Sequence, residues 1–195
     1  GKFGAQVQAL LKKAAAVDIQ TVCPLHGPVL SGEALAEALR LYDIWSSYGV
    51  ESEGVMIAYA SVYGNTEKAV ALLAKTLEEM GCPKVVVTCV QRDDWAEAVE
   101  DAFRYGKLVL ASPTYNGFLF PAMREFIEHL TERNYQNRQV AFLENGSWAP
   151  AAAREMKKLL EGCKNVTLGG TVTIRSAMTE ETPAQLKALA AEILA

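Results

Sequence analysis

Hydrophobic positions along this chain of 195 residues follow two patterns that alternate. Short continuous apolar runs, such as Val85-Val86-Val87 and Leu108-Val109-Leu110, are separated by longer stretches in which apolar residues recur every three or four positions. The first pattern is typical of strands buried on both faces of a sheet, and the second is typical of amphipathic helices. The sequence therefore predicts an α/β fold, with a doubly wound parallel sheet covered by helices on both sides.

The unit of one strand followed by one helix occurs five times after residue 54. Crossovers in such a sheet are right-handed, and we expect the strand order 2-1-3-4-5, in which the first, third and fourth strands of the series are neighbours. Strands are expected at 55–60, 84–90, 107–112, 139–144 and 171–175. Helices are expected at 67–80, 94–105, 121–133 and 150–160, with a last helix from about residue 183.

The first 50 residues have a different pattern. Helices are expected at 5–17 and 33–48, with Ser31 as a candidate N-cap, and a short strand at 19–23. The glycine-flanked polar segment GVESEG, at 49–54, is the best candidate for a linker. We therefore expect a helical appendage over 1–50 and an α/β domain over 51–195. Because the chain starts without methionine or a signal peptide, we interpret it as a piece of a longer protein.

Composition and charge narrow the class of partner. The formal net charge of −4 argues against nucleic-acid binding, which requires clustered lysine and arginine. No window approaches the roughly 20 continuous apolar residues of a membrane span, so no membrane partner is expected. The four cysteines lie far apart without a C-x-x-C pair, which favours reduced thiols in the cytoplasm over a zinc site or a disulfide framework.

Three loops that follow expected strands are unusually polar. They are SVYGNT at 61–66, SPTYNG at 112–117 and ENGSW at 144–148. Ligands of doubly wound sheets bind outside the carboxyl ends of the strands, where the winding direction reverses. Because these loops follow the first, third and fourth strands, we expect them to line one crevice.

The loop at 61–66 has the composition of a seat for a phosphate monoester. It lacks the G-x-x-x-x-G-K-[ST] pattern of nucleoside-triphosphate sites and the G-x-G-x-x-G pattern of dinucleotide sites. The hydroxyls of Ser61 and Thr66, the Asn65 amide and the N–H groups of a helix start can surround a phosphate, and Gly64 would allow close approach. Hydrogen bonds worth about 1.5–3 kcal/mol each would outweigh the missing lysine or arginine. The alternative is an ordinary capped helix after a turn.

The other two loops offer groups that suit a planar ring. The polar edges of residues 114–116 can bond a heteroaromatic ring, and Asn116-Gly117 turns readily with positive φ. Trp148 follows a Gly-Ser turn and would lie where its indole can stack on a planar ligand. A tryptophan of the hydrophobic core is the alternative.

The segments YASVYGNTEKAV, LVLASPTYNGFLFPAMREFI and FLENGSW resemble the flavodoxin domain at the carboxyl end of flavodiiron proteins. Upstream, CPLHGPVL and LYDIWSSY are similar to the end of that family's metallo-β-lactamase-like domain. The resemblance covers essentially the whole chain. It implies a flavodoxin-like three-layer sandwich for 51–195 and a carboxyl-terminal remnant of the di-iron domain for 1–50.

The resemblance implies that FMN is bound non-covalently between the three loops. The flavodoxin peptide near the flavin N5, which reorients with redox state, would correspond to Asn116-Gly117. The phosphate would be held by Ser61, Val62, Tyr63, Gly64, Asn65 and Thr66. One side of the isoalloxazine would be lined by Pro113, Thr114, Tyr115, Asn116 and Gly117, and the other by Asn145, Gly146, Ser147 and Trp148.

The two histidines have separate interpretations. The resemblance places His26 at the family's last di-iron ligand, a role that exists only in the full-length parent. The family's main ligand cluster, H-x-E-x-D-H, does not occur here, and one histidine cannot hold two irons. In this chain alone His26 is therefore expected to be a loop residue without metal. His129 is expected to be a solvated helix residue, and Trp95 to pack locally at a helix start.

The resemblance implies that the parent is an oxidoreductase that reduces oxygen or nitric oxide. Electrons from a rubredoxin or an NAD(P)H-dependent reductase would pass through FMN to the di-iron site of the neighbouring subunit in a head-to-tail homodimer. This flavoprotein fragment alone would perform only the electron transfer. Its acidic charge, a stacked aromatic ring and a phosphate without a cationic partner predict a low redox potential for the flavin.

Three other functions make different demands on the sequence. A free-standing flavodoxin-like NAD(P)H:quinone oxidoreductase uses the same sheet but needs room for a nicotinamide, against which Trp148 argues mildly. A phosphorylated receiver domain needs acidic residues where this chain has Ala60-Ser61 and Ser112-Pro113. A pure interaction module, with residues 5–48 as a dimer arm, would be indicated by a stable dimer with an empty crevice.

Overall fold

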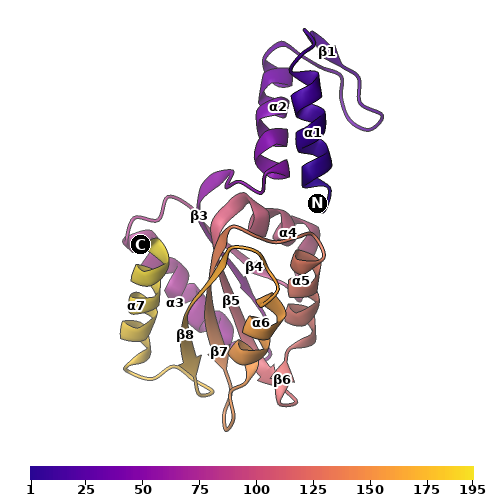
Figure 1. The fold of residues 1–195 in the computed structure, drawn as a ribbon. Helices are drawn as coiled ribbons and strands as arrows, with labels where there is room; N and C mark the ends of the chain where they lie inside the picture. The colour runs from indigo at the N-terminus through magenta and orange to yellow at the C-terminus, as the bar shows by residue number, and fades with distance from the viewer. The chain divides into compact units, whose positions relative to one another are not determined.

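The computed structural model describes all 195 residues, which form two compact units, Gly1–Glu51 and Ser52–Ala195 (Figure 1). The chain passes from one unit to the next within the glycine-flanked segment at 49–54. None of the helices combines the length and the hydropathy that a membrane span requires.

The first unit is a pair of helices connected through a short antiparallel ladder. Helix α1 spans Gly4–Ala14 and helix α2 spans Gly32–Ser46, and between them β1 (Thr21–Val22) pairs with β2 (Leu30–Ser31). The two helices lie close together because α1 begins with a glycine: a Cβ at Gly4 would collide with the carbonyl oxygen of Ser46. The sequence pattern predicted only the first of these two strands.

The second unit is built on one parallel sheet with the strand order β4-β3-β5-β7-β8. This is the predicted order 2-1-3-4-5, and the flavodoxin-like α/β fold is confirmed. The strands span Ser52–Tyr59 (β3), Val85–Cys89 (β4), Tyr105–Tyr115 (β5), Arg138–Asn145 (β7) and Val166–Ile174 (β8).

Helices cover both faces of this sheet and complete three layers (Figure 1). Alternate residues of β3 point to opposite faces: Met56 belongs to the hydrophobic cluster that includes α4, α5 and α6, whereas Ile57 belongs to the cluster that includes α3 and α7. Both residues are fully buried, so each face carries its own hydrophobic core. The helices span Asn65–Glu79 (α3), Trp95–Arg104 (α4), Pro121–Thr131 (α5), Ala152–Leu160 (α6) and Thr182–Leu194 (α7).

Two strands depart from the sequence pattern. Strand β5 continues to Tyr115 and returns as the short strand β6 (Phe118–Leu119). Strand β8 begins at Val166 rather than at the expected residue 171, and its register on β7 shifts near Gly169-Gly170. Glycines lack the side-chain packing by which strands are recognised, so this half of β8 had no clear apolar pattern.

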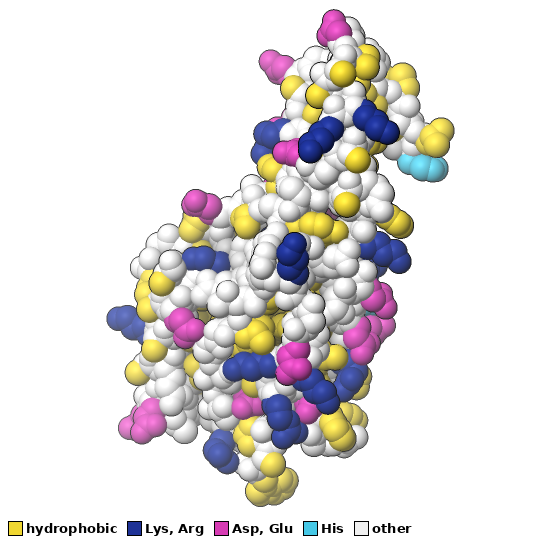
Figure 2. Space-filling model, in the orientation of Figure 1, with side chains coloured by type: hydrophobic (Ala, Val, Ile, Leu, Met, Phe, Trp, Pro, Cys, Tyr) yellow, Lys and Arg dark blue, Asp and Glu magenta, His cyan; other side chains and the backbone are white.

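Charged side chains of both signs are interspersed over the face of the second unit shown in Figure 2. Their mixture agrees with the small formal net charge of −4.

Candidate functional site

The three polar loops leave the same edge of the sheet. Strands β3, β5 and β7 are consecutive neighbours, and they remain paired up to their carboxyl ends. The amide of Ala60 donates a hydrogen bond of 2.9 Å to the carbonyl of Ala111, and Pro113 lies opposite Asn145 in the next pair. The structure therefore brings the predicted loops together, with the loop after β5 between the other two.

The first loop ends at a helix start whose N-cap residue supplies no capping side chain. The N-cap residue of α3 is Gly64, in the left-handed region with φ of 82° and without a capping side chain. The first N–H groups of an α-helix have no intrahelical acceptor, and their dipoles favour an anion. One first-turn amide does have a side-chain acceptor, because Glu67 donates to the Ser61 hydroxyl oxygen, so the alternative of a capped helix after a turn stays a prediction. The positive φ of Gly64 favours glycine over residues that carry a side chain.

The hydroxyl-bearing residues of this loop are buried, and its centre is exposed. Ser61 and Thr66 are 8% and 2% exposed, whereas Tyr63 is 90% exposed. The Ser61 oxygen accepts a hydrogen bond of 3.3 Å from the amide of Glu67, but its own hydroxyl proton stays available to a further acceptor. The loop can thus offer both backbone and side-chain donors to an anion.

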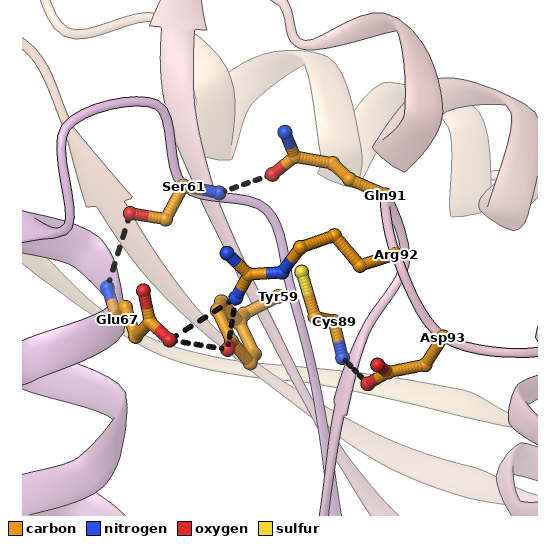
Figure 3. A network of polar contacts seen from close by, with 7 residues as sticks. All are labelled: Tyr59, Ser61, Glu67, Cys89, Gln91, Arg92 and Asp93. Carbon is orange, nitrogen blue, oxygen red and sulfur yellow. Dashed lines mark hydrogen bonds and ion pairs between the residues drawn. The ribbon is translucent and has the colours of Figure 1, made fainter.

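A cation reaches this region from another part of the chain, as Figure 3 shows. Arg92, in the loop after β4, donates hydrogen bonds of 3.1 Å to the Glu67 carboxylate and to the Tyr59 phenol. Arg92 thus places a cation beside the loop, while its bonds go to Glu67 and Tyr59 and not to residues 61–66. The expectation of a phosphate without a cationic partner stays a prediction. Only the tertiary structure joins Arg92 to residues that lie 25 and 33 positions away in the sequence.

Tyr59 is the buried member of this group. Its phenol donates to the Glu67 carboxylate over 3.0 Å. Burial raises the pKa of Tyr59 to about 12, and the hydrogen bond to Glu67 acts in the same direction. The phenol therefore keeps its proton and remains a donor throughout the neutral range.

The second loop forms a tight hairpin between β5 and β6. Asn116 and Gly117 have φ angles of 51° and 76°, as the sequence pattern predicted for this dipeptide. Tyr115 is partly exposed, and its ring meets Phe120 edge to face at 5.5 Å. The hydroxyl of Thr114 faces inward, where it accepts the first amides of α6 at 2.9 and 3.3 Å.

The third loop is held by contacts that its sequence did not reveal. The side-chain amide of Asn145 donates to the carbonyl of Ser176 over 2.9 Å and accepts from its N–H over 3.0 Å. The hydroxyls of Ser147 and Ser176 lie 2.8 Å apart. Trp148 is 93% exposed, so the alternative of a core tryptophan is wrong.

Glu144, the first residue of the third loop, joins that loop to α6 and β8, a structural role that the sequence analysis did not predict. One of its buried carboxylate oxygens accepts the Ala153 amide at 2.9 Å, and the other accepts the Thr173 hydroxyl at 2.8 Å. A polar residue at the end of an otherwise apolar strand was the available signal. Gly146 completes the arrangement, because a Cβ there would lie 3.0 Å from the Thr114 hydroxyl oxygen.

Neither histidine belongs to the three loops. His26 is exposed in the connection between β1 and β2, and no group of three or more His, Cys, Asp or Glu side chains is placed to hold a metal ion. The expectation of a solvated His129 is wrong, since its ring packs against Trp95 in a tilted arrangement at a centroid distance of 4.2 Å. Trp95 likewise packs across α4 and α5 rather than locally.

Comparison with known proteins adds a family and a set of relatives. The family model described as "Flavodoxin domain" matches residues 56–188. The rubredoxin-oxygen oxidoreductase of Megalodesulfovibrio gigas is 22% identical over 182 residues, which cover 92% of this chain and 44% of that protein. A putative diflavin flavoprotein A 3 of Synechocystis is 34% identical over 116 residues, which cover 58% of this chain and 19% of that protein. The chain thus spans less than half the length of these curated relatives.

Solved structures show the same fold. The rubredoxin oxygen:oxidoreductase of Desulfovibrio gigas superposes with a TM-score of 0.88 and 19% identity, over 98% of this chain and 48% of that one. The flavodiiron protein of Giardia intestinalis superposes with a TM-score of 0.86 and 22% identity, over 99% of this chain and 49% of that one. A flavodoxin of Streptococcus pneumoniae superposes with a TM-score of 0.60 and 21% identity, over 72% of this chain and 97% of that one.

Proposed function

We propose, from the premise that this chain belongs to the flavodoxin domain family, that it binds FMN non-covalently and serves as an electron-transfer module. One observation carries the proposal: three polar loops converge on the carboxyl edge of the sheet. The first contains a helix start whose N-cap residue is a glycine, and the third presents an exposed indole. These features suit the phosphate and the ring system of a mononucleotide.

The phosphate of FMN would lie at the start of α3. The N–H groups of Asn65 and Thr66 and the hydroxyl proton of Ser61 would be its donors, and Gly64 leaves the backbone accessible, because a Cβ there would meet nothing within 4 Å. The helix dipole favours the negative charge at this end. The residues present therefore fit a phosphate monoester.

The isoalloxazine would lie between the second and third loops. Trp148 would stack on one face of the ring, and the partly exposed Tyr115 would contribute to the opposite wall. The Asn116-Gly117 turn would present its peptide to the edge of the ring. When bound, FMN supplies the electron-accepting and electron-donating chemistry, and the protein supplies its orientation and electrostatic surroundings.

The longer protein would be a flavodiiron oxidoreductase, a reductase of oxygen or nitric oxide. The similarity to rubredoxin-oxygen oxidoreductase supports a rubredoxin as the electron donor, and an NAD(P)H-dependent reductase is the other candidate. Residues 1–51 would then be the remnant of a metallo-β-lactamase-like domain, and His26 would ligate iron only in the complete protein. We place this function in the cytoplasm, with the FMN of one subunit serving the di-iron site of its head-to-tail partner. A low redox potential stays a prediction.

The proposal is tested by titrating the purified protein with FMN while following flavin fluorescence. Quenching that saturates at one FMN per chain, together with a yellow protein after gel filtration, is the expected result. A protein that leaves FMN fluorescence unchanged would contradict the proposal. Steady-state oxidation of NADH with a quinone distinguishes the electron-transfer module, which lacks this activity, from the alternative quinone oxidoreductase.

A further inference from the structure

A cluster of three side chains, Arg92, Glu67 and Tyr59, lies beside the proposed phosphate seat (Figure 3). Arg92 and Tyr59 converge on the same carboxylate oxygen of Glu67, at 3.1 and 3.0 Å. Glu67 also joins the seat through the backbone, because its amide donates to the Ser61 hydroxyl oxygen. The cluster and the seat therefore share one turn of helix.

Glu67 has two opposite effects at this position. A carboxylate in the first turn of a helix interacts favourably with the helix dipole. The same negative charge repels an anion that binds at the same helix end. An anion at the first amides of α3 would share one helix turn with Glu67, a separation over which the Debye length of about 8 Å at physiological ionic strength leaves the repulsion largely unscreened.

The position of Arg92 is fixed by its neighbours in the chain. Gln91 accepts a hydrogen bond of 2.6 Å from the Ser61 amide, and Asp93 accepts one of 2.7 Å from the Cys89 amide. The backbone on both sides of Arg92 is thus tied to the phosphate loop and to the end of β4. Its guanidinium reaches Glu67 from an anchored segment, not from a free loop.

We propose that Arg92 is a positioning residue for the phosphate: by pairing with Glu67 against Tyr59, it holds this carboxylate in place and cancels its charge at the α3 start. This inference rests on the proposed function. Without Arg92, an incoming dianion meets an uncompensated carboxylate one residue beyond Thr66. A ligand without phosphate is insensitive to the same change.

The test compares FMN with riboflavin, which has the same ring system without the phosphate. Arg92→Gln is expected to weaken FMN binding about threefold to fivefold, the range for a partly exposed ion pair, and to leave riboflavin binding unchanged. Adding Glu67→Gln is expected to restore the FMN affinity. The matched control is Lys75→Gln, which removes the same charge from the Lys75–Glu79 pair at the other end of α3 and should change neither affinity.

The outcomes separate the inference from the proposed function. If Arg92→Gln and Lys75→Gln give the same ratio of FMN to riboflavin affinity, or if Glu67→Gln fails to restore the affinity, the positioning role is wrong while FMN binding stands. A wild-type protein that binds neither flavin overturns both. Thermal melting of each ligand-free variant checks that it is folded. If Arg92→Gln alone is unstable, the double variant with Glu67→Gln is compared with the wild type, and the inference requires that both bind FMN equally well.

Discussion

Tyr59 donates its phenolic proton to the carboxylate of Glu67 over 3.0 Å, which links the end of β3 to the first turn of α3. The Glu67 oxygen that accepts this bond also accepts one from Arg92. A buried phenol thereby contributes to the position of a charge at the surface. Its protonation state can be followed through stability.

Stability is expected to fall at alkaline pH as Tyr59 loses its proton. An unfolded tyrosine has a pKa of about 10, whereas the folded pKa is raised to about 12. Between these values the unfolded chain has released the proton and the folded one keeps it, so stability is fully present below about pH 10 and is lost up to about pH 12. Urea midpoints at pH 9 and pH 11 measure the loss, which should be smaller in Tyr59→Phe.

Burial also raises the pKa of Tyr135, so the loss should shrink in Tyr59→Phe without vanishing. Tyr63→Phe is the control, because that phenol is almost fully exposed, and its variant should show the wild-type loss. Equal losses in the wild type and in Tyr59→Phe would contradict the assignment.

Replacing both buried hydroxyls of the phosphate loop should weaken FMN much more than riboflavin. Hydrogen bonds to a charged acceptor contribute about 1.5–3 kcal/mol each, so Ser61→Ala with Thr66→Ala should weaken FMN at least tenfold. Thr76→Ala is the control, because that hydroxyl bonds the Leu72 carbonyl farther along the same helix. Fluorescence titrations with both flavins give the comparison, and equal weakening of the two would refute the phosphate assignment.

Trp148→Ala should weaken both flavins by a similar factor and leave the melting temperature unchanged. An aromatic contact is worth about 0.5–1.5 kcal/mol beyond the burial of its surface, and it acts on the ring that FMN and riboflavin share. The indole is 93% exposed in the protein, so the fold loses no packing. Trp148→Phe should retain most of the affinity. A marked drop in melting temperature would show that the indole has a structural role instead.

Gly54→Ala should destabilise the second unit by about 2–3 kcal/mol. Gly54 has a φ of 154°, and a Cβ there would lie 2.6 Å from the Lys84 carbonyl oxygen and 3.0 Å from the Tyr105 ring. Gly162→Ala is the control, because its Cβ would meet nothing within 4 Å. Urea denaturation followed by circular dichroism measures both. Similar midpoints for the two variants would show that β3 can shift at no cost.

The central part of the strand order could be predicted from the sequence because β3, β5 and β7 are largely buried on both faces. The continuous apolar run 108–110 is fully buried in β5, as this pattern predicts. The run 85–87 lies on the edge strand β4, where Val87 is 43% exposed. The convergence of the three loops then followed from topology alone. The first half of strand β8 could not be predicted, because Gly169-Gly170 interrupts its apolar pattern. The amide of Gly170 instead donates a hydrogen bond of 2.7 Å to Glu192 of α7, a contact that no local pattern reveals.

The composition of the candidate site was predictable only for residues inside the loops. Arg92 and Ser176 join the site from other connections of the chain, and no local pattern marks them. The orientation of side chains was equally hidden. Thr114 and Asn145 were expected to face the ring, yet their polar atoms bond α6 and Ser176, so any contact with a flavin would involve other atoms of these residues.

The inward hydrogen bonds of Thr114 have a kinetic consequence. They join the hairpin after β5 to the start of α6, and Glu144 fixes the same helix start to the end of β7. The hairpin after β5 and the loop after β7 are thus ordered when the chain folds, and their conformational entropy is lost before a flavin binds. The binding site should therefore be preorganised, so that the flavin binds at a rate set by diffusion and orientation, with little rearrangement of the backbone.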